Sequence, residues 1–193
     1  MKHQLFLTNV IRPGLAVLAD VVGGEVQSPP AEVLMLAIAI QESALRHRTQ
    51  VGGPARGWWQ FERAGGLAGV MDHARTRTHL AHFCEAVGLK HDLYALWDAL
   101  PYSELLQVAL ARLLLWSDSR PLPALGDKEG SWSYYLRNWR PGKPGTARWG
   151  AAYDGAAELV RIDAPAPETQ TADALRIVQH LEASLGALRK VLR

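Results

Sequence analysis

The feature that most constrains the fold is a helix-length segment that is apolar on every side. Residues 33–40 read Val-Leu-Met-Leu-Ala-Ile-Ala-Ile, without a polar interruption. Ser28-Pro29-Pro30 precede them and combine a capping hydroxyl with proline in the first turn, which is a strong helix start. A helix that is apolar all round lies in the interior of a globular core. The sequence therefore predicts a buried helix over residues 30–45, with the rest of the chain packed around it.

Most of the remaining chain also has helical patterning. Residues 50–66 are an exception, because they are rich in glycine and lack a helical period, which predicts a loop or a short irregular hairpin. The expected fold class is mainly α, with a small irregular or β-like insert. Further helices are expected at residues 15–22, 67–73, 76–87, 93–99, 105–116, 129–139 and 146–160.

The C-terminal part differs in composition from the rest. We expect one domain over residues 1–161, a polar, proline-containing linker over 162–170 and an amphipathic helix over 171–193. Apolar residues in that helix recur in steps of three and four for about three heptads. Two interpretations stay open: the helix packs on its own domain, or it is an oligomerisation arm through which the chain associates with itself.

Composition excludes several classes of function. Lys and Arg number 21 against 19 Asp and Glu, so the balance does not favour nucleic acid as a partner. The single cysteine, Cys84, excludes a disulfide framework and a cysteine-based zinc site. His79 and His82 share a helix face but lack a second ligand pair, so we expect no metal and no cofactor.

No membrane span or secretory signal is expected from the apolar runs. Residues 33–40 are the longest uninterrupted run and are far too short to cross a bilayer. Arg12-Pro13 interrupts the apolar stretch near the N-terminus, and no small-residue cleavage site follows. The sequence therefore predicts synthesis in the cytoplasm without a signal peptide.

Glu42 is the residue whose position most favours chemistry. It lies at the end of the apolar helix, beside the tryptophan-rich loop. Burial and the negative end of the helix dipole both disfavour a carboxylate, so both raise its pKa. A carboxyl group with a raised pKa can serve as a general acid near neutral pH. The alternative is a solvated glutamate at a helix terminus.

The segment from Glu42 to Gln60 resembles the signature of the soluble lytic transglycosylases in the lysozyme superfamily. That signature is Glu-Ser, a loop, and then Gly-Ala-x-Gly-Leu-Met-Gln. Here the chain has Glu42-Ser43 and later Ala55-Arg56-Gly57-Trp58-Trp59-Gln60. The same segment resembles lysozyme-like proteins of tailed bacteriophages. Pro54 stands where the family has glycine, and Trp58-Trp59 replace Leu-Met.

The resemblance implies an α+β lysozyme-like fold and a set of site residues. Glu42 takes the position of the catalytic acid, and Gln60 that of the glutamine lining the cleft. The family's later Ala-Tyr-Asn-Ala-Gly element has a loose counterpart in residues 138–142, with Trp139 in the tyrosine position and Tyr135 as its rival. The implied substrate-binding residues are Ser43, Gly57, Trp58, Trp59, Gln60, Tyr135 and Trp139.

The resemblance also implies a reaction on peptidoglycan glycan strands. Glu42 would protonate the oxygen of the β-1,4 bond between N-acetylmuramic acid and N-acetylglucosamine. In a transglycosylase the same carboxylate then activates the muramyl C6 hydroxyl, whereas a hydrolase uses water and usually a second carboxylate. The sequence does not select among the candidates for that second group, which are Glu62, Asp72, Asp118 and Asp127.

A second reading belongs to another class of protein. The chain could be a phage virion or assembly protein that keeps a lysozyme-like fold as a structural or wall-binding module with little or no catalysis. Under either reading we expect the protein to act at the cell wall, which it would reach through a holin-type lesion or inside a virion.

Overall fold

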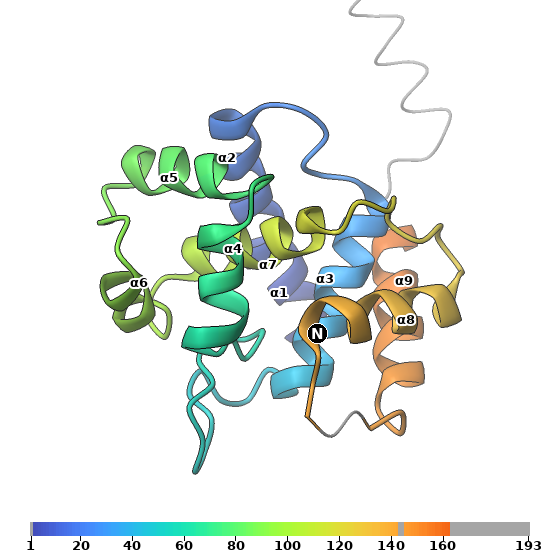
Figure 1. Ribbon diagram of the computed structural model, residues 1–193. Coiled ribbons are helices and arrows are strands. Elements are labelled where there is room, and N and C mark those ends of the chain that lie inside the picture. Colours follow the sequence, from blue (N-terminus) through green and yellow to red (C-terminus); the bar gives the residue numbers. More distant parts are fainter. Residues whose placement is uncertain (1, 143–144, 163–193) are drawn as a thin grey trace, which may run out of the picture. The chain divides into compact units, whose positions relative to one another are not determined.

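The fold is mainly helical, as the sequence predicts, and Met1–Val160 form one compact unit (Figure 1). The computed structural model describes residues 2–142 and 145–162. In that part of the chain no strand forms, and the only bridge pairings are Thr49 with Arg56 and Arg56 with Phe61. The α-helices are α1 (Lys2–Phe6), α2 (Arg12–Val22), α3 (Pro29–Ser43), α4 (Ala68–Asp72), α5 (Arg77–Ala86), α6 (Leu93–Ala99), α7 (Glu104–Ser117), α8 (Lys128–Trp139) and α9 (Trp149–Ile162), with π-helical turns η1 (Leu7–Ile11) and η2 (Arg63–Leu67).

Helix α3 is the buried helix that its sequence predicts. Every residue from Ala31 to Ile40 is buried. The Ser28 hydroxyl accepts a hydrogen bond from the Ala31 N–H and caps its start. At the other end Ala44 adopts a left-handed conformation with φ of 50°, and this stops the helix immediately after Ser43. Glu42 is therefore held in the last turn, where the apolar core ends.

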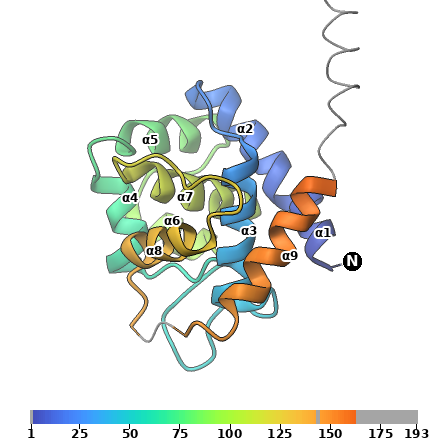
Figure 2. The same ribbon diagram turned by 90° about the vertical axis from the view of Figure 1, so that its right-hand side faces the viewer.

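Helix α7 is the second element buried on nearly all sides. Ser103 caps its start by accepting a hydrogen bond from the Leu106 N–H, and residues 106–115 are all buried. It packs against α2, α3, α4 and α5. Figure 2 shows α9 on the other side of α3 from α5. Tyr135 of α8 and Trp149 of α9 stack with their ring centroids 5.4 Å apart.

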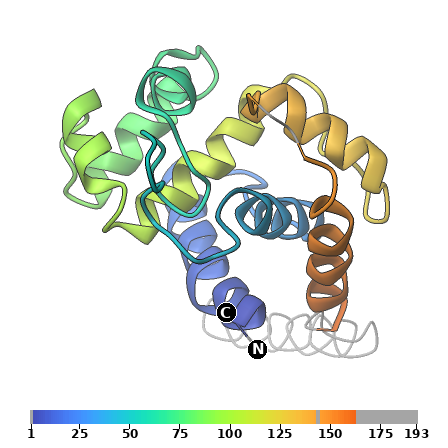
Figure 3. The same cartoon turned by 90° about the horizontal axis from the view of Figure 1, so that it is seen from below.

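The glycine-rich segment crosses between these helices as an irregular loop. Seen from below in Figure 3, the chain after α3 runs in front of α7 before it enters η2. The Trp58 N–H donates to the Gln107 side chain at 2.7 Å, which attaches the loop to α7. Gly57 has φ of +79°, and a Cβ there would lie 3.0 Å from Gln107, so the close approach requires glycine. This loop carries Trp58 and Trp59, two of the aromatic residues of the predicted site.

The N-terminal helix differs from the expected one. The sequence predicts a short helix over residues 15–22, yet helical structure runs from Lys2 to Val22. A proline lacks an N–H, and the π-helical turn η1 directly before it shifts the hydrogen-bond register, with the Arg12 N–H donating to the Leu7 carbonyl. The resulting 21-residue helix is long and apolar enough to cross a membrane, although core helices and signal sequences pass the same test. Its residues Leu7, Ile11, Leu15 and Leu18 are fully buried.

The predicted boundary after residue 161 falls at the end of α9. The linker over 162–170 and the amphipathic helix over 171–193 lie, apart from Ile162, outside the described residues.

Candidate active site

A cleft of about 780 Å³ opens at the C-terminal end of α3. Glu42 lies on its wall, together with Gln60 and Phe61 of the loop and residues of α4, α7 and α8. The two bridge pairings of Arg56 close the loop on itself, and the segment that follows α8 also lines the cleft. Segments from five parts of the chain thus meet around one carboxyl group.

Burial and one hydrogen bond define the state of Glu42. Burial raises its pKa to about 7, which is the largest of the influences on it. The Tyr135 hydroxyl donates to Glu42 Oε1 at 2.5 Å, and this bond and the charge of Arg148 favour the ionised form in part. The negative charge of Glu62 acts in the opposite direction and adds to the rise. Glu42 therefore holds a proton through much of the range below neutral pH.

Tyr135 is itself fixed by the aromatic residues around it. It is 2% exposed and contacts the rings of Trp132, Trp139 and Trp149. Burial and the neighbouring Glu42 carboxylate both raise the pKa of its hydroxyl, so Tyr135 keeps its proton and acts as a donor. A rigid aromatic wall thus orients one oxygen of Glu42 and leaves the other for a ligand.

Three of the eight residues predicted for the site line the cleft, and a fourth contacts one of them. Glu42, Gln60 and Trp139 are in the lining, and Tyr135 touches Glu42. Gln60 has φ of 48°, an uncommon backbone conformation for a residue other than glycine, and its Nε2 donates to the Gly57 carbonyl at 2.8 Å. Strain of this kind often lies at functional sites, although here it also shapes the loop.

The other four predicted residues lie outside the cleft lining and have structural roles. Ser43 donates to the Ala39 carbonyl and accepts from the Leu45 N–H, so its hydroxyl ends α3. Gly57 allows the loop to approach α7. Trp58 packs edge-on against Phe6. Trp59 is fully buried, and its indole N–H donates to the Met35 carbonyl, so its ring offers no surface to a sugar.

The four candidates for the second carboxylate differ in whether they line the cleft. Glu62 and Asp72 are exposed and line the cleft, whereas Asp118 and Asp127 do not. Hydrogen bonds from the Arg120 backbone N–H and from the Arg137 and Asn138 side chains outweigh burial and hold the pKa of Asp118 below its usual range. Asp127 caps α8. Of the two cleft carboxylates, Glu62 is the one whose charge acts on Glu42. Glu62 is therefore the acidic group best placed to work with Glu42.

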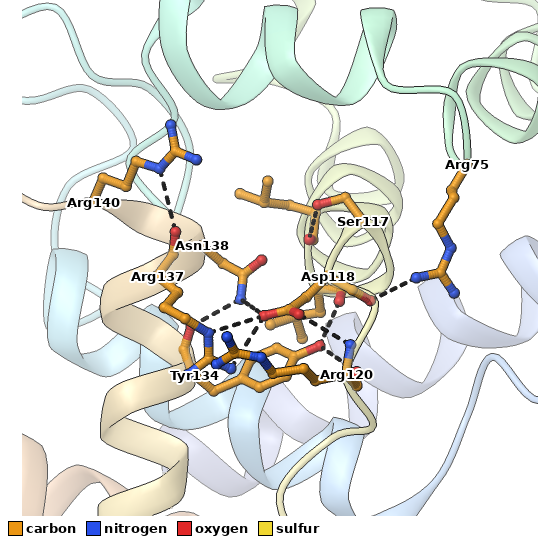
Figure 4. Close-up of polar contacts among 10 residues, drawn as sticks. Arg75, Ser117, Asp118, Arg120, Tyr134, Arg137, Asn138 and Arg140 are labelled. Carbon is orange, nitrogen blue, oxygen red and sulfur yellow. Dashed lines mark hydrogen bonds and ion pairs between the residues drawn. The ribbon is translucent and has the colours of Figure 1, made fainter.

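The end of α8 adds side chains to the cleft wall that are not among the eight predicted site residues. Arg137, Asn138 and Arg140 line it from the end of α8, and Arg140 donates from Nε to the Arg137 carbonyl (Figure 4). Arg140 has φ of 48° and ends α8, which turns the chain back along the cleft. The Asn-Trp-Arg-Pro-Gly segment was the available signal, because a Pro-Gly pair marks a turn.

Comparison with known proteins does not add a relative. No protein-family model matches the chain, and neither a curated protein nor a solved structure shows significant similarity to it. Among the described residues, no three His, Cys, Asp or Glu side chains are grouped so that they could hold a metal ion. The chemistry of the site therefore has to be argued from Glu42 and its surroundings.

Proposed function

We propose that the protein cleaves peptidoglycan at the β-1,4 bond between N-acetylmuramic acid and N-acetylglucosamine, with Glu42 as general acid and base. The observation that carries the proposal is a single carboxyl group with a pKa of about 7, oriented by the Tyr135 hydroxyl and placed in an open cleft. The pKa near neutrality lets one group give up a proton and take it back at physiological pH. The resemblance of residues 42–60 to the transglycosylase signature supplies the substrate class.

The proposed reaction starts with proton transfer from Glu42 to the glycosidic oxygen. The bond to the leaving sugar breaks as that oxygen gains the proton, and an oxocarbenium-like centre develops on the muramyl ring. The Glu42 carboxylate, stabilised by the Tyr135 hydrogen bond, then removes a proton from the attacking group. If the muramyl C6 hydroxyl attacks, the product is a 1,6-anhydro sugar; if water attacks, it is a reducing end.

The position of Glu62 provides a way to separate these two outcomes. An ionised carboxylate across the cleft from a protonated one is the arrangement that glycoside hydrolases use. Glu62 is exposed in the cleft, whereas burial raises the pKa of Glu42. A transglycosylase needs no such second group. The effect of removing the Glu62 charge therefore reports on the reaction type.

The test is a digest of purified peptidoglycan with products identified by mass spectrometry. We expect soluble muropeptides from the wild-type protein and none from Glu42→Gln. Glu85→Gln, an exposed glutamate of α5 away from the cleft, is the matched control and should retain full activity. Anhydro ends that persist in Glu62→Gln would indicate a transglycosylase, and reducing ends that disappear in Glu62→Gln would indicate a hydrolase.

A folded wild-type protein that releases nothing from several wall types would contradict the proposal. Five of the eight predicted site residues lie outside the cleft lining, and this favours the alternative, a wall-binding or virion structural module. That alternative predicts sedimentation with insoluble peptidoglycan, equal for wild type and Glu42→Gln, without release of fragments. Action at the wall, through a holin-type lesion or as a virion component, is part of both proposals.

A further inference from the structure

A second cavity, of about 630 Å³, lies at the opposite end of α3 from Glu42. Ser28, Pro29 and Pro30 at the start of α3 form one side, and the end of α7 and the segment after it form another. The side chains that distinguish this cavity are three arginines, Arg75, Arg112 and Arg120. It shares no lining residue with the active-site cleft.

Arg112 is the anchor of this cavity. It is only 5% exposed, and its guanidinium lies 5.2 Å from the ring centre of Trp116. Its Nε donates to the Val26 carbonyl at 2.6 Å and its Nη2 to the Glu25 carbonyl at 3.2 Å. None of the described residues accepts a hydrogen bond from Nη1. Burial lowers the pKa of this guanidinium, because removal from water disfavours its charged form.

The other two arginines add donors at the rim. Arg75 is exposed and uses one nitrogen, Nη1, to donate to the Asp118 carbonyl at 2.7 Å (Figure 4). The side chain of Arg120 is exposed and donates to none of the described residues. An arginine presents five N–H donors in a planar fork that suits phosphate oxygens. The cavity therefore has many donors and few acceptors of its own.

The cavity has few acidic residues, and one of them already accepts hydrogen bonds from neighbouring groups. Asp118 and Glu25 are the acidic residues in the lining. The Asp118 carboxylate already accepts from Arg137 and Asn138, as Figure 4 shows, and from the Arg120 backbone N–H. Counting Arg137 with Asp118, four arginines face two carboxylates, which leaves an excess of two positive charges. A phosphate monoester carries a charge of about −2 at neutral pH.

We propose that this cavity binds the phosphate group of a phosphate monoester or of free phosphate. The bound group would accept from Arg112 Nη1 and from the unused nitrogens of Arg75 and Arg120, and would balance the excess charge. The inference goes beyond the proposed function and does not depend on it, because the cavity is separate from Glu42 and the cleft.

The test is a titration of the full-length, nitrogen-15-labelled chain with inorganic phosphate, followed by nuclear magnetic resonance. We expect saturable shifts at the Trp116 indole and at residues 118–122, with a dissociation constant on the order of 1 mM or tighter. Acetate at the same ionic strength is the carboxylate control and should not saturate. Glucose 6-phosphate separates the two sources, since tighter binding than inorganic phosphate would indicate a phosphorylated ligand rather than the free ion.

Substitutions of the arginines test whether the phosphate-induced resonance shifts come from binding in the cavity. Arg112→Gln could fail to fold, so the informative variant is the double substitution Arg75→Gln and Arg120→Gln, which changes two exposed side chains. We expect it to weaken phosphate binding at least tenfold. The matched control, Arg46→Gln and Arg77→Gln, removes two exposed arginines away from the cavity and should change binding less than twofold. Shifts that do not saturate, that acetate reproduces or that are equal in both double variants would overturn the proposal.

Discussion

At the scale of single residues, the chemistry depends on a glutamate that the fold keeps partly out of water. A carboxyl group whose pKa rises on folding binds its proton more tightly in the native state than in the unfolded chain. The contribution of this group to the free energy of unfolding is therefore fully present below its pKa in the unfolded chain. It is lost as the pH rises through its pKa in the folded protein. For Glu42 that window runs from 4.5 to about 7.

Glu42→Gln should consequently stabilise the protein at alkaline pH and leave it nearly unchanged in acid. Glutamine is neutral at every pH, and its oxygen can still accept from the Tyr135 hydroxyl. We expect the free energy of unfolding to increase by about 2 kcal/mol near pH 8 and by less than about 0.5 kcal/mol near pH 4. Denaturant titrations at both pH values measure this. A loss of stability at pH 8 would mean that the Glu42 charge is well compensated and that the group is structural.

Tyr135→Phe tests the hydrogen bond to Glu42 through the pH dependence of activity. The hydroxyl stabilises the ionised carboxylate, so its removal raises the Glu42 pKa further. The alkaline fall in kcat/KM should move to higher pH by about one pH unit, with lower activity at the optimum. Trp132→Phe, which changes another ring against Tyr135 without touching Glu42, is the control. If the alkaline fall in kcat/KM stays at the same pH in Tyr135→Phe, the hydrogen bond has no part in the mechanism.

At the scale of elements, the glycine-rich loop is shaped by one tight contact. Gln107 is buried, and its amide donates to the Leu100 carbonyl and accepts from the Trp58 N–H, so it cannot move away from Gly57. Both Gly57 and Gly52 have positive φ, but a Cβ on Gly52 would meet nothing within 4 Å. Both glycines therefore adopt a backbone conformation that disfavours other residues, but only Gly57 lies so close to a neighbouring side chain that a Cβ would contact it.

Gly57→Ala should destabilise the protein by about 2–3 kcal/mol, and Gly52→Ala by about 1 kcal/mol. The left-handed conformation accounts for the part common to both, and the contact with Gln107 for the remainder. Gly57→Ala should also lower activity, because Gln60 in the cleft is held by the Gly57 carbonyl. Thermal unfolding of both variants beside the wild type measures the difference. Equal effects would show that Gln107 accommodates the methyl group.

The elements themselves were largely predictable from the sequence, whereas the site was predictable only in part. Apolar periodicity and capping residues place α3, α6 and α7 within two residues of their bounds, because burial and caps are local signals. The continuation of the first helix through Pro13 was not predictable, since it depends on a π-helical turn. Glu42 was found from its place at the end of an apolar helix. The separation of Trp59 from Trp139, one in the core and one in the cleft, depends on tertiary packing that no spacing encodes.

At the scale of the whole molecule, α3 connects the two cavities. Its C-terminal end carries Glu42, and its N-terminal end borders the arginine-lined cavity. The helix is rigid because its interior residues are all buried. Ligands at the two ends are therefore separated by a packed core.

Removal of residues 163–193 should leave the cleft-bearing unit intact. The buried apolar core described here runs from Phe6 to Val160. Its large exposed apolar side chains, among them Leu5, Val51 and Leu125, come from separate segments and form no continuous helix face that needs a cover. We expect residues 1–162 to unfold within about 2 °C of the full chain. Calorimetry of both proteins, with sedimentation to determine their masses, is the measurement. If the full chain sediments as an oligomer and residues 1–162 as a monomer, with the same unfolding temperature, then 171–193 is an oligomerisation arm. A markedly lower unfolding temperature of residues 1–162 would show that this segment packs on the domain.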